Sequence, residues 1–277
     1  MKKFKILLCI SFVLTALSIY INWYVNKELS QRSYTGTYQN CHKIWASRGL
    51  YENRKEQNSI VSFQRAFSLG AIGGEVDFYY DVKLDDFIVS HDRPKKDKNG
   101  VNIYQKKLTL NELLIATSKN HYFWFDYKNL DRLSADETKR AITRLKNITA
   151  QGDLRNRIYL EGSNPLKLSQ YTNAGFNTIL AVGLLPSDNI FSGFVAKVYK
   201  VVYYFSNVTA LAIQYGKFDN PKYSSEAINS LSNIPRFIFH VPVDEALINS
   251  LIKDSNVRVV LVGRDLSVNK YNMNVCI

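Results

Sequence analysis

The sequence predicts an α/β protein, a (β/α)8 barrel of the TIM type preceded by one N-terminal transmembrane helix. Short apolar runs of strand character alternate with helical runs about eight times along the chain. This alternation is typical of parallel strands joined by crossover helices, and eight such units favour a closed barrel. The 277 residues, 46% of them hydrophobic, can form one large core. A doubly wound open sheet is the alternative, although the sequence contains neither a glycine-rich dinucleotide fingerprint nor a P-loop.

The N-terminus combines a basic start with a long apolar run. Met1–Lys5 carries three lysines, and Ile6–Val25 is nearly continuous apolar sequence that ends in a tryptophan and a tyrosine. This length is enough for one membrane crossing, and aromatic residues favour the membrane interface. The charge bias predicts a cytoplasmic N-terminus and an extracytoplasmic barrel. The alternative is a signal peptide cleaved near Ala16-Leu17-Ser18, which would give a secreted protein.

The domain organisation follows the same pattern. We expect residues 1–25 to be the membrane anchor or signal segment, the polar residues 26–41 a linker, and residues 42–277 the barrel. Cys41 and Cys276 flank the folded part, and outside the cytoplasm a disulfide between them is permitted; two free thiols are the alternative. The formal charge is +12, but the basic residues are scattered, so we expect no nucleic-acid partner. An anionic membrane or a phosphate substrate fits this charge equally well.

The expected barrel elements alternate along the chain. The expected strands are Lys43–Ser47, Glu75–Tyr80, Tyr122–Tyr127, Arg157–Glu161, Thr178–Val182, Ala210–Gln214, Phe237–Val241 and Arg258–Val262. The expected helices are Ser59–Leu69, Thr109–Ser118, Ala135–Ala150, Pro165–Thr172, Phe194–Phe205, Ser224–Leu231 and Asp244–Lys253. Ser134 is a natural N-cap for the third of these helices.

Two other segments have distinctive compositions. Arg93–Lys107 is rich in Lys, Asp and Gly and is expected to be a loop beside the active-site mouth. Phe191–Phe205 is aromatic, apolar and basic, a composition that can lie on a membrane surface. The alternative for this second segment is an ordinary barrel helix with Val and Phe inward and Lys outward.

The stretch Gly73–Pro94 carries a group of chemically reactive residues. Side chains alternate between the two faces of a strand, so Glu75 and Asp77 share one face. Two adjacent carboxylates repel each other unless a cation lies between them, and oxygen ligands at this spacing suit Mg²⁺ or Ca²⁺. The following run, Phe87–Ser90, brings His91 to the same unit. The alternative is an edge strand with solvated acids and a loop histidine.

Further polar residues lie where TIM barrels place their chemistry, at the C-terminal ends of the strands. These residues are Ser47, Arg48, Glu75, Asp77, Asp126, Lys128, Glu161, His240, Arg264 and Asp265. The convergence of several strand ends on acids, a lysine and an arginine indicates a functional site rather than solvated surface.

Five segments resemble, in order, the motifs of the glycerophosphodiester phosphodiesterase family. They are Ala46–Gly49, Gln57–Ser59, Gly73–Asp77, Val89–Asp92 and Phe125–Lys128. The family's motifs in this order are H-R-G, E-N-T, E-x-D, H-D and E-x-K. The resemblance covers about the N-terminal half of the soluble part, whereas the C-terminal half matches only loosely.

The resemblance implies a metal-dependent phosphodiester hydrolase that acts on glycerophosphodiesters or a related lipid or envelope phosphodiester. It also implies a TIM-type barrel and Mg²⁺ or Ca²⁺ as the cofactor. The implied metal ligands are Glu75, Asp77 and Asp126, and the implied catalytic residues are His91 as acid or base with Arg48 and Lys128 as phosphate contacts. A cation and basic side chains stabilise charge on the phosphoryl oxygens, and a histidine can protonate the departing oxygen. The implied partners are a small phosphodiester or lipid head-group substrate and, through the N-terminal helix, the membrane.

Three positions depart from the family's pattern. The first catalytic histidine is Ser47, the third metal ligand is Asp126 rather than Glu, and the glutamate of E-N-T is Gln57. A serine without a base is neither a proton acceptor nor an activated nucleophile. We therefore expect weak turnover, with a catalytically inactive phosphate- or lipid-binding barrel as the alternative. His240, near the mouth, either supplies the missing imidazole or is a core histidine held by a hydrogen bond.

Overall fold

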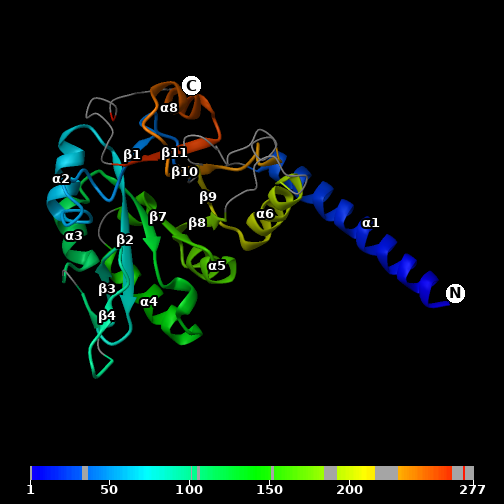
Figure 1. Ribbon diagram of the computed structural model, residues 1–277, viewed down its shortest axis with the longest axis horizontal. Coiled ribbons are helices and arrows are strands. Elements are labelled where there is room, and N and C mark those ends of the chain that lie inside the picture. The colour runs from blue at the N-terminus through cyan, green and yellow to red at the C-terminus, as the bar shows by residue number, and fades with distance from the viewer. Residues whose placement is uncertain are drawn as a thin grey trace.

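A closed barrel of parallel strands forms the body of the molecule (Figure 1). The structure is a computed structural model that describes residues 2–32, 37–100, 102–104, 107–150, 153–183, 192–215, 230–263 and residue 271. The barrel strands are β1 (Ile44–Ser47), β2 (Gly73–Asp81), β6 (Tyr122–Tyr127), β7 (Ile158–Gly162), β8 (Asn177–Val182), β9 (Ala210–Gln214), β10 (Arg236–Phe239) and β11 (Val257–Val262). They pair in this order, and β11 pairs with β1, so the predicted TIM-type barrel is confirmed.

Helices cover the outside of the barrel. They are α2 (Ile60–Ser68), α3 (Leu110–Thr117), α4 (Ala135–Ile148), α5 (Pro165–Asn173), α6 (Ser192–Ser206) and α8 (Glu245–Lys253), with 3-10 turns at Leu130–Arg132 and Leu154–Arg157. Ser134 is the predicted N-cap of α4: its hydroxyl accepts from the Glu137 amide, and the Glu137 side chain accepts from the Ser134 amide. Of the expected elements, Ser224–Leu231 lies largely outside the described residues.

The core has two layers because barrel strands alternate inward and outward side chains. The inner layer is aromatic-rich and includes Trp45, Trp124 and Phe237, all fully buried. The outer layer lies between strands and helices and contains Val76 and Phe78 of β2. A β-carbon on Gly73 would lie 2.5 Å from the Trp45 indole, so the interior can accommodate that tryptophan only beside a glycine.

The segment after β2 is more ordered than its composition predicts. β3 (Asp86–Val89) pairs antiparallel with β2 and extends the sheet beyond the barrel. The insertion Arg93–Lys107, expected to be a loop, contains a hairpin of β4 (Lys95–Lys96) and β5 (Asn102–Ile103). Gly100, at a φ of 71°, lies in the turn of this hairpin and its amide bonds to the Asp97 carbonyl. The sequence-based expectation of a loop is therefore wrong for the paired residues.

The protruding helix in Figure 1 is α1 (Lys2–Gln31). Its residues Cys9–Gln31 form a helix long and apolar enough to cross a membrane. The segment 26–41, expected to be a linker, is helical as far as Gln31. The reason is tertiary packing, since Val25 and Leu29 are buried in the outer core.

The contact between α1 and α6 holds this helix against the barrel. Lys200 of α6 is buried and donates to the Asn26 side chain at 2.9 Å, and the Tyr24 and Tyr204 rings meet edge to face. Phe194 and Phe205 of α6 point to solvent instead, with exposed fractions of 63% and 62%. The alternative of an ordinary helix with Phe inward and Lys outward is therefore wrong at these positions.

The cysteine predictions are only partly covered by the described residues. Cys9 is free, and Cys41 is disulfide-bonded. Cys276 lies outside the described residues. The pairing of Cys41 with Cys276 therefore stays a prediction.

Candidate functional site

Strand register brings three carboxylates together at the barrel mouth. Glu75 and Asp77 share the inner face of β2, and Asp77 lies directly opposite Asp126 of β6. One ligand oxygen from each of Glu75, Asp77 and Asp126 lies within 4.8 Å of the other two. We call these three residues the carboxylate cluster. The predicted convergence is confirmed, because parallel neighbours carry their strand ends to the same edge.

Two cations that the sequence analysis named lie against this cluster. Arg48, directly after β1, places Nε 2.9 Å from Asp77 Oδ2, and Lys128, directly after β6, places Nζ 2.6 Å from Asp77 Oδ1. Lys128 also pairs with Asp126. Burial lowers the pKa of Lys128, but the Asp77 and Asp126 carboxylates outweigh it and raise the pKa, so the ammonium stays charged.

The carboxylates repel one another in a poorly hydrated setting. Burial first, then the charges of Asp77 and Asp126, raise the pKa of Glu75 to about 8. Burial and the Asp77 charge raise the pKa of Asp126 to about 6. Two positive side chains therefore do not fully compensate the negative charge at the mouth.

These residues fit a divalent cation. Asp77 Oδ1 is fully buried and, among the described residues, has no hydrogen-bond partner with suitable geometry, although the Lys128 ammonium lies nearby. Three carboxylates supply the hard oxygen ligands that Mg²⁺ and Ca²⁺ prefer. A cation bound among them would remove the repulsion that raises the pKa of Glu75. Glu75, Asp77 and Asp126 are therefore the residues that can hold it.

Ser47 takes part in this network as a hydrogen-bond donor. Its hydroxyl donates to Glu75 Oε2 at 2.6 Å. Ser47 is the last residue of β1 and pairs with Glu75 in the sheet, so its side chain meets a carboxylate of the cluster. The hydroxyl therefore stabilises the ionised form of Glu75, and its described partner is this carboxylate rather than an imidazole.

His91 lies beside the carboxylate cluster on a separate segment. The amide of Ser90 donates to the Asp77 carbonyl at 2.9 Å, which fixes His91 next to β2. The His91 ring is within hydrogen-bond distance of Asp92, with 2.9 Å between Nδ1 and Oδ1. Together with Gln57 and Asn58, these residues line a small cavity at the mouth.

Glu161 and His240, two other residues at strand ends, differ in burial. Glu161 is buried and accepts a hydrogen bond from the Trp124 indole. Burial and then the Asp126 charge raise its pKa well above the ordinary value. His240 follows β10 at a φ of 55°, and its side chain is exposed. Its place directly after the C-terminal end of β10 puts it on the mouth side. Partial loss of hydration and then the charges of Arg48 and Lys128 lower its pKa. The alternative of a buried core histidine is wrong. Arg264 and Asp265 lie outside the described residues.

Asn58 is a site residue to which the sequence analysis assigned no role beyond its place in the Gln57–Ser59 motif. Its side chain donates to Asp77 Oδ2 at 2.7 Å and accepts from the Asp77 amide at 3.1 Å. It is buried and has a φ of 53°, a left-handed conformation that asparagine tolerates better than most residues. The position of this asparagine in the Gln57–Ser59 motif was the available signal, but its partner is 19 residues away.

The fold and the site together define a class, a TIM-type barrel with an acidic, cation-competent mouth. Comparison with solved structures identifies proteins that share this fold. The chain is similar to a glycerophosphodiester phosphodiesterase from Thermotoga maritima, with 14% identity, a TM-score of 0.57 and coverage of 82% of this chain and 95% of that one. It is also similar to one from Parabacteroides distasonis, with 17% identity, a TM-score of 0.52 and coverage of 82% and 94%.

A third similar structure contains a ligand. It is a phosphodiesterase from Oleispira antarctica in complex with the product sn-glycerol-3-phosphate, with 13% identity, a TM-score of 0.57 and coverage of 83% of this chain and 94% of that one. No family model and no curated protein matches the sequence. The resemblance predicted from the motifs is thus confirmed at the level of the fold, and the low identity fits a divergent chain.

Proposed function

We propose that this protein is a divergent, metal-dependent phosphodiester hydrolase of the glycerophosphodiester phosphodiesterase type. The observation that carries the proposal is the carboxylate cluster with Arg48 and Lys128 in direct contact with it. This arrangement is suited to a phosphodiester, because a cation site beside two fixed positive charges attracts and polarises an anionic phosphoryl group. The fold supports it, since the similar structures are phosphodiesterases.

The roles of the residues follow from their positions. Glu75, Asp77 and Asp126 would hold Mg²⁺ or Ca²⁺, which supplies Lewis-acid stabilisation of charge on the phosphoryl oxygens. Arg48 and Lys128 orient the phosphate and neutralise its charge. These five side chains bind and position the reacting group.

Proton transfer to the leaving group is assigned to His91. Asp92 holds the ring at Nδ1, which leaves Nε2 to protonate the departing alkoxide oxygen. Asn58 keeps Asp77 oriented, because its side chain donates to Asp77 Oδ2 and accepts from the Asp77 backbone amide. Without an imidazole at position 47, we expect slow turnover of simple glycerophosphodiesters.

A second candidate is a barrel that binds a phosphate or lipid head group without turning it over. The hydrogen bond from Ser47 to Glu75 favours this non-catalytic barrel. Ser47 stands where the family has its first histidine, and its hydroxyl donates to a carboxylate. Losing one general acid or base costs about 10²–10⁴-fold in rate. The exposed His240 at the mouth is the imidazole best placed to compensate that loss.

We also propose a membrane-anchored topology. Residues 1–25 cross the membrane, and the barrel formed by residues 42–277 lies outside the cytoplasm, held close to the membrane by the α1–α6 contact. The basic N-terminus and the aromatic end of the apolar run support this orientation. Secretion after signal cleavage is the alternative.

The decisive experiment is hydrolysis of a panel of glycerophosphodiesters with Ca²⁺, with Mg²⁺ and with a chelator. We expect slow, cation-dependent release of glycerol phosphate, and its loss in Asp77→Asn. Cation-dependent binding without any product would support the non-catalytic barrel. Neither binding nor product, in folded protein, would refute both functions.

A further inference from the structure

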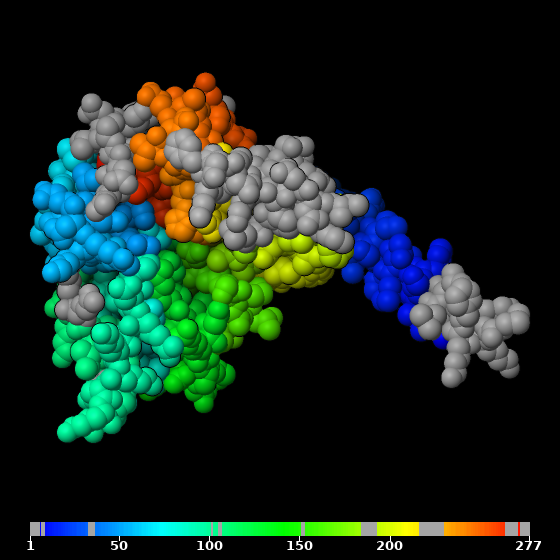
Figure 2. All heavy atoms as spheres, in the orientation of Figure 1, coloured from blue at the N-terminus to red at the C-terminus, as the bar shows by residue number. Residues whose placement is uncertain are grey.

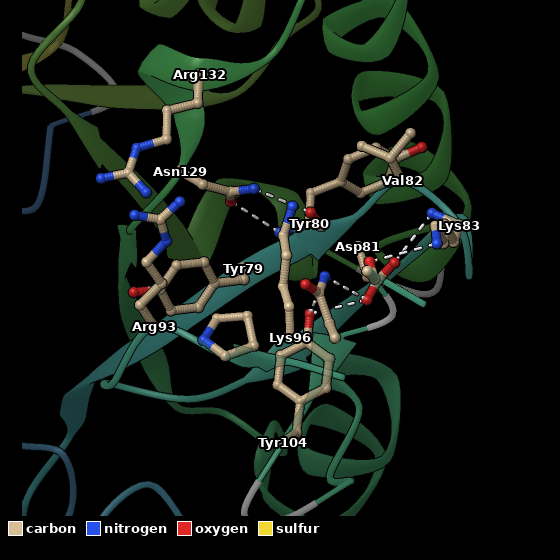
Figure 3. Close-up of a pocket in the computed structure, with 13 residues that line it drawn as sticks. Tyr79, Tyr80, Asp81, Val82, Lys83, Arg93, Lys96, Tyr104, Asn129 and Arg132 are labelled. Atoms are coloured by element: carbon tan, nitrogen blue, oxygen red, sulfur yellow. Dashed lines mark hydrogen bonds between the residues drawn. The ribbon is translucent and has the colours of Figure 1, made fainter. Parts of the chain in front are cut away.

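A second cavity opens beside the barrel mouth, outside the residues assigned to catalysis. Its volume is about 470 Å³. Three segments enclose it: the end of β2, the hairpin of β4 and β5 with its flanks, and the turn after β6 (Figure 3). Because the hairpin belongs to the insertion, this cavity is a feature that the insertion adds to the barrel.

Four positive side chains line the cavity wall, against one carboxylate. They are Lys83, Arg93, Lys96 and Arg132. Figure 3 shows the side chains of Arg93 and Arg132 pointing toward one another from opposite segments. Within the part of the chain that the structure describes, none of the four forms an ion pair. Like charges that converge on one cavity repel each other unless an anion lies between them.

The one carboxylate in the wall is already committed to holding the hairpin. Asp81 is buried and accepts from the Asn102 side chain at 2.9 Å and from the Tyr104 hydroxyl at 3.0 Å. It also accepts from the backbone amide of Lys83 at 2.9 Å. Asp81 thus fixes the hairpin against the end of β2, and its hydrogen bonds go to these groups rather than to Arg93 or Arg132.

The cavity is continuous with the catalytic face of β2. Tyr79 lines it and follows Asp77 on the same face of the strand, since side chains repeat every second residue. At about 3.3 Å per residue, Tyr79 lies about 7 Å and Asp81 about 13 Å beyond Asp77 along the strand.

We propose that this cavity is an anion subsite that binds a second phosphate of the substrate, with Arg93 and Arg132 as its main contacts. Planar guanidinium groups bind phosphate oxygens in pairs, which suits them to this role. The preferred substrate is then a repeating polyol-phosphate chain whose next phosphate would reach the cavity, which begins about 7–13 Å from Asp77 along β2. The inference rests on the proposed function for the catalytic site and adds the substrate class.

The test separates binding from turnover. A synthetic chain of three glycerol units and two phosphodiesters is titrated calorimetrically into the full-length protein in detergent with a chelator present; glycerophosphoglycerol, with one phosphodiester, is the comparison ligand. We expect Arg93→Gln with Arg132→Gln to weaken binding of the two-phosphate ligand at least about tenfold, since each charge-assisted contact is worth that much. Binding of the one-phosphate ligand should stay unchanged.

The charge control is Lys253→Gln. Lys253 is an exposed lysine on α8 that lines no described cavity, so its substitution should leave both affinities unchanged. An equal loss for both ligands, an equal loss in the control, or no loss in the double variant would overturn the subsite. In kinetics with cation, the wild type should prefer the two-phosphate substrate and the double variant should lose that preference. If no substrate is turned over, the proposed function fails, while the calorimetry still decides the subsite.

Discussion

Cation binding at the carboxylate cluster should depend steeply on pH, because a cation competes with protons there. The pKa of Glu75 is about 8 and that of Asp126 about 6 in the cation-free site. At pH 7 only about one Glu75 side chain in eleven is ionised, and ionising the rest costs about 1.4 kcal/mol. Affinity for Ca²⁺ or Mg²⁺ should therefore rise with pH and level off above pH 8.

The magnitude follows from the two pKa values. The apparent association constant should increase roughly fifteenfold from pH 6 to pH 7, when Glu75 and Asp126 both titrate, and about tenfold more from pH 7 to pH 9. About one proton should be released per cation bound at pH 7. Isothermal titration calorimetry in two buffers of different ionisation enthalpy measures both quantities.

Glu75→Gln is the matched variant, since it removes the titrating carboxylate and keeps its size. We expect weaker binding at pH 9 and a nearly flat profile between pH 7 and pH 9. A wild-type affinity that stays constant from pH 6 to pH 9, without proton release, would refute the electrostatic reasoning. Binding that is unchanged in Glu75→Gln would remove this residue from the cation site.

Four further outcomes are expected. Without cation, the melting temperature should fall as pH rises from about 5 to about 8. The reason is the raised pKa of Glu75, since the folded protein holds the stabilising proton at low pH and loses it as the pH passes 8. Scanning calorimetry with a chelator measures this, and a melting temperature that rises over the same range would contradict it. Ser47→Ala should change the hydrolysis rate little, whereas Ser47→His should raise it, as steady-state kinetics can check; a large loss in Ser47→Ala would assign chemistry to the hydroxyl. Protease added to intact spheroplasts should degrade the barrel, and full protection would place it in the cytoplasm. In proteoliposomes, a nitroxide at Phe194→Cys should collide with oxygen more than with a water-soluble nickel chelate, unlike one at the exposed Ile115→Cys of α3; equal behaviour of the two would leave α6 without a membrane contact.

The space-filling view explains why α6 enters these predictions. In Figure 2, α6 lies on the side of the body from which α1 protrudes. Since Tyr24 is near the end of the apolar run and meets Tyr204, a membrane that contains this run must lie close to α6. Neither segment alone predicts that proximity.

Local patterns in the sequence were sufficient for the order and type of the barrel elements that the structure describes. Alternation along Glu75–Tyr80 predicted which carboxylates share a face, and it did so because a strand's period of two is a property of the backbone. The predicted bounds of the strands differ from the observed ones by no more than two residues. The convergence of Asp126 with Asp77 followed from the rule that parallel strands end at one edge.

Contacts between distant segments were decided only by the tertiary structure. The partner of Asn58, the raised pKa of Glu161 and the packing of Val25 against the barrel cannot be predicted from the sequence, because each depends on which segments meet after the barrel closes. The cavity beside the barrel mouth is the clearest case. Arg93 and Arg132 lie on separate segments, and neither segment by itself predicts that the two side chains line one cavity. Charge, burial and pKa are properties of a three-dimensional neighbourhood, so the sequence provides the residues and the closed barrel determines what each of them contacts.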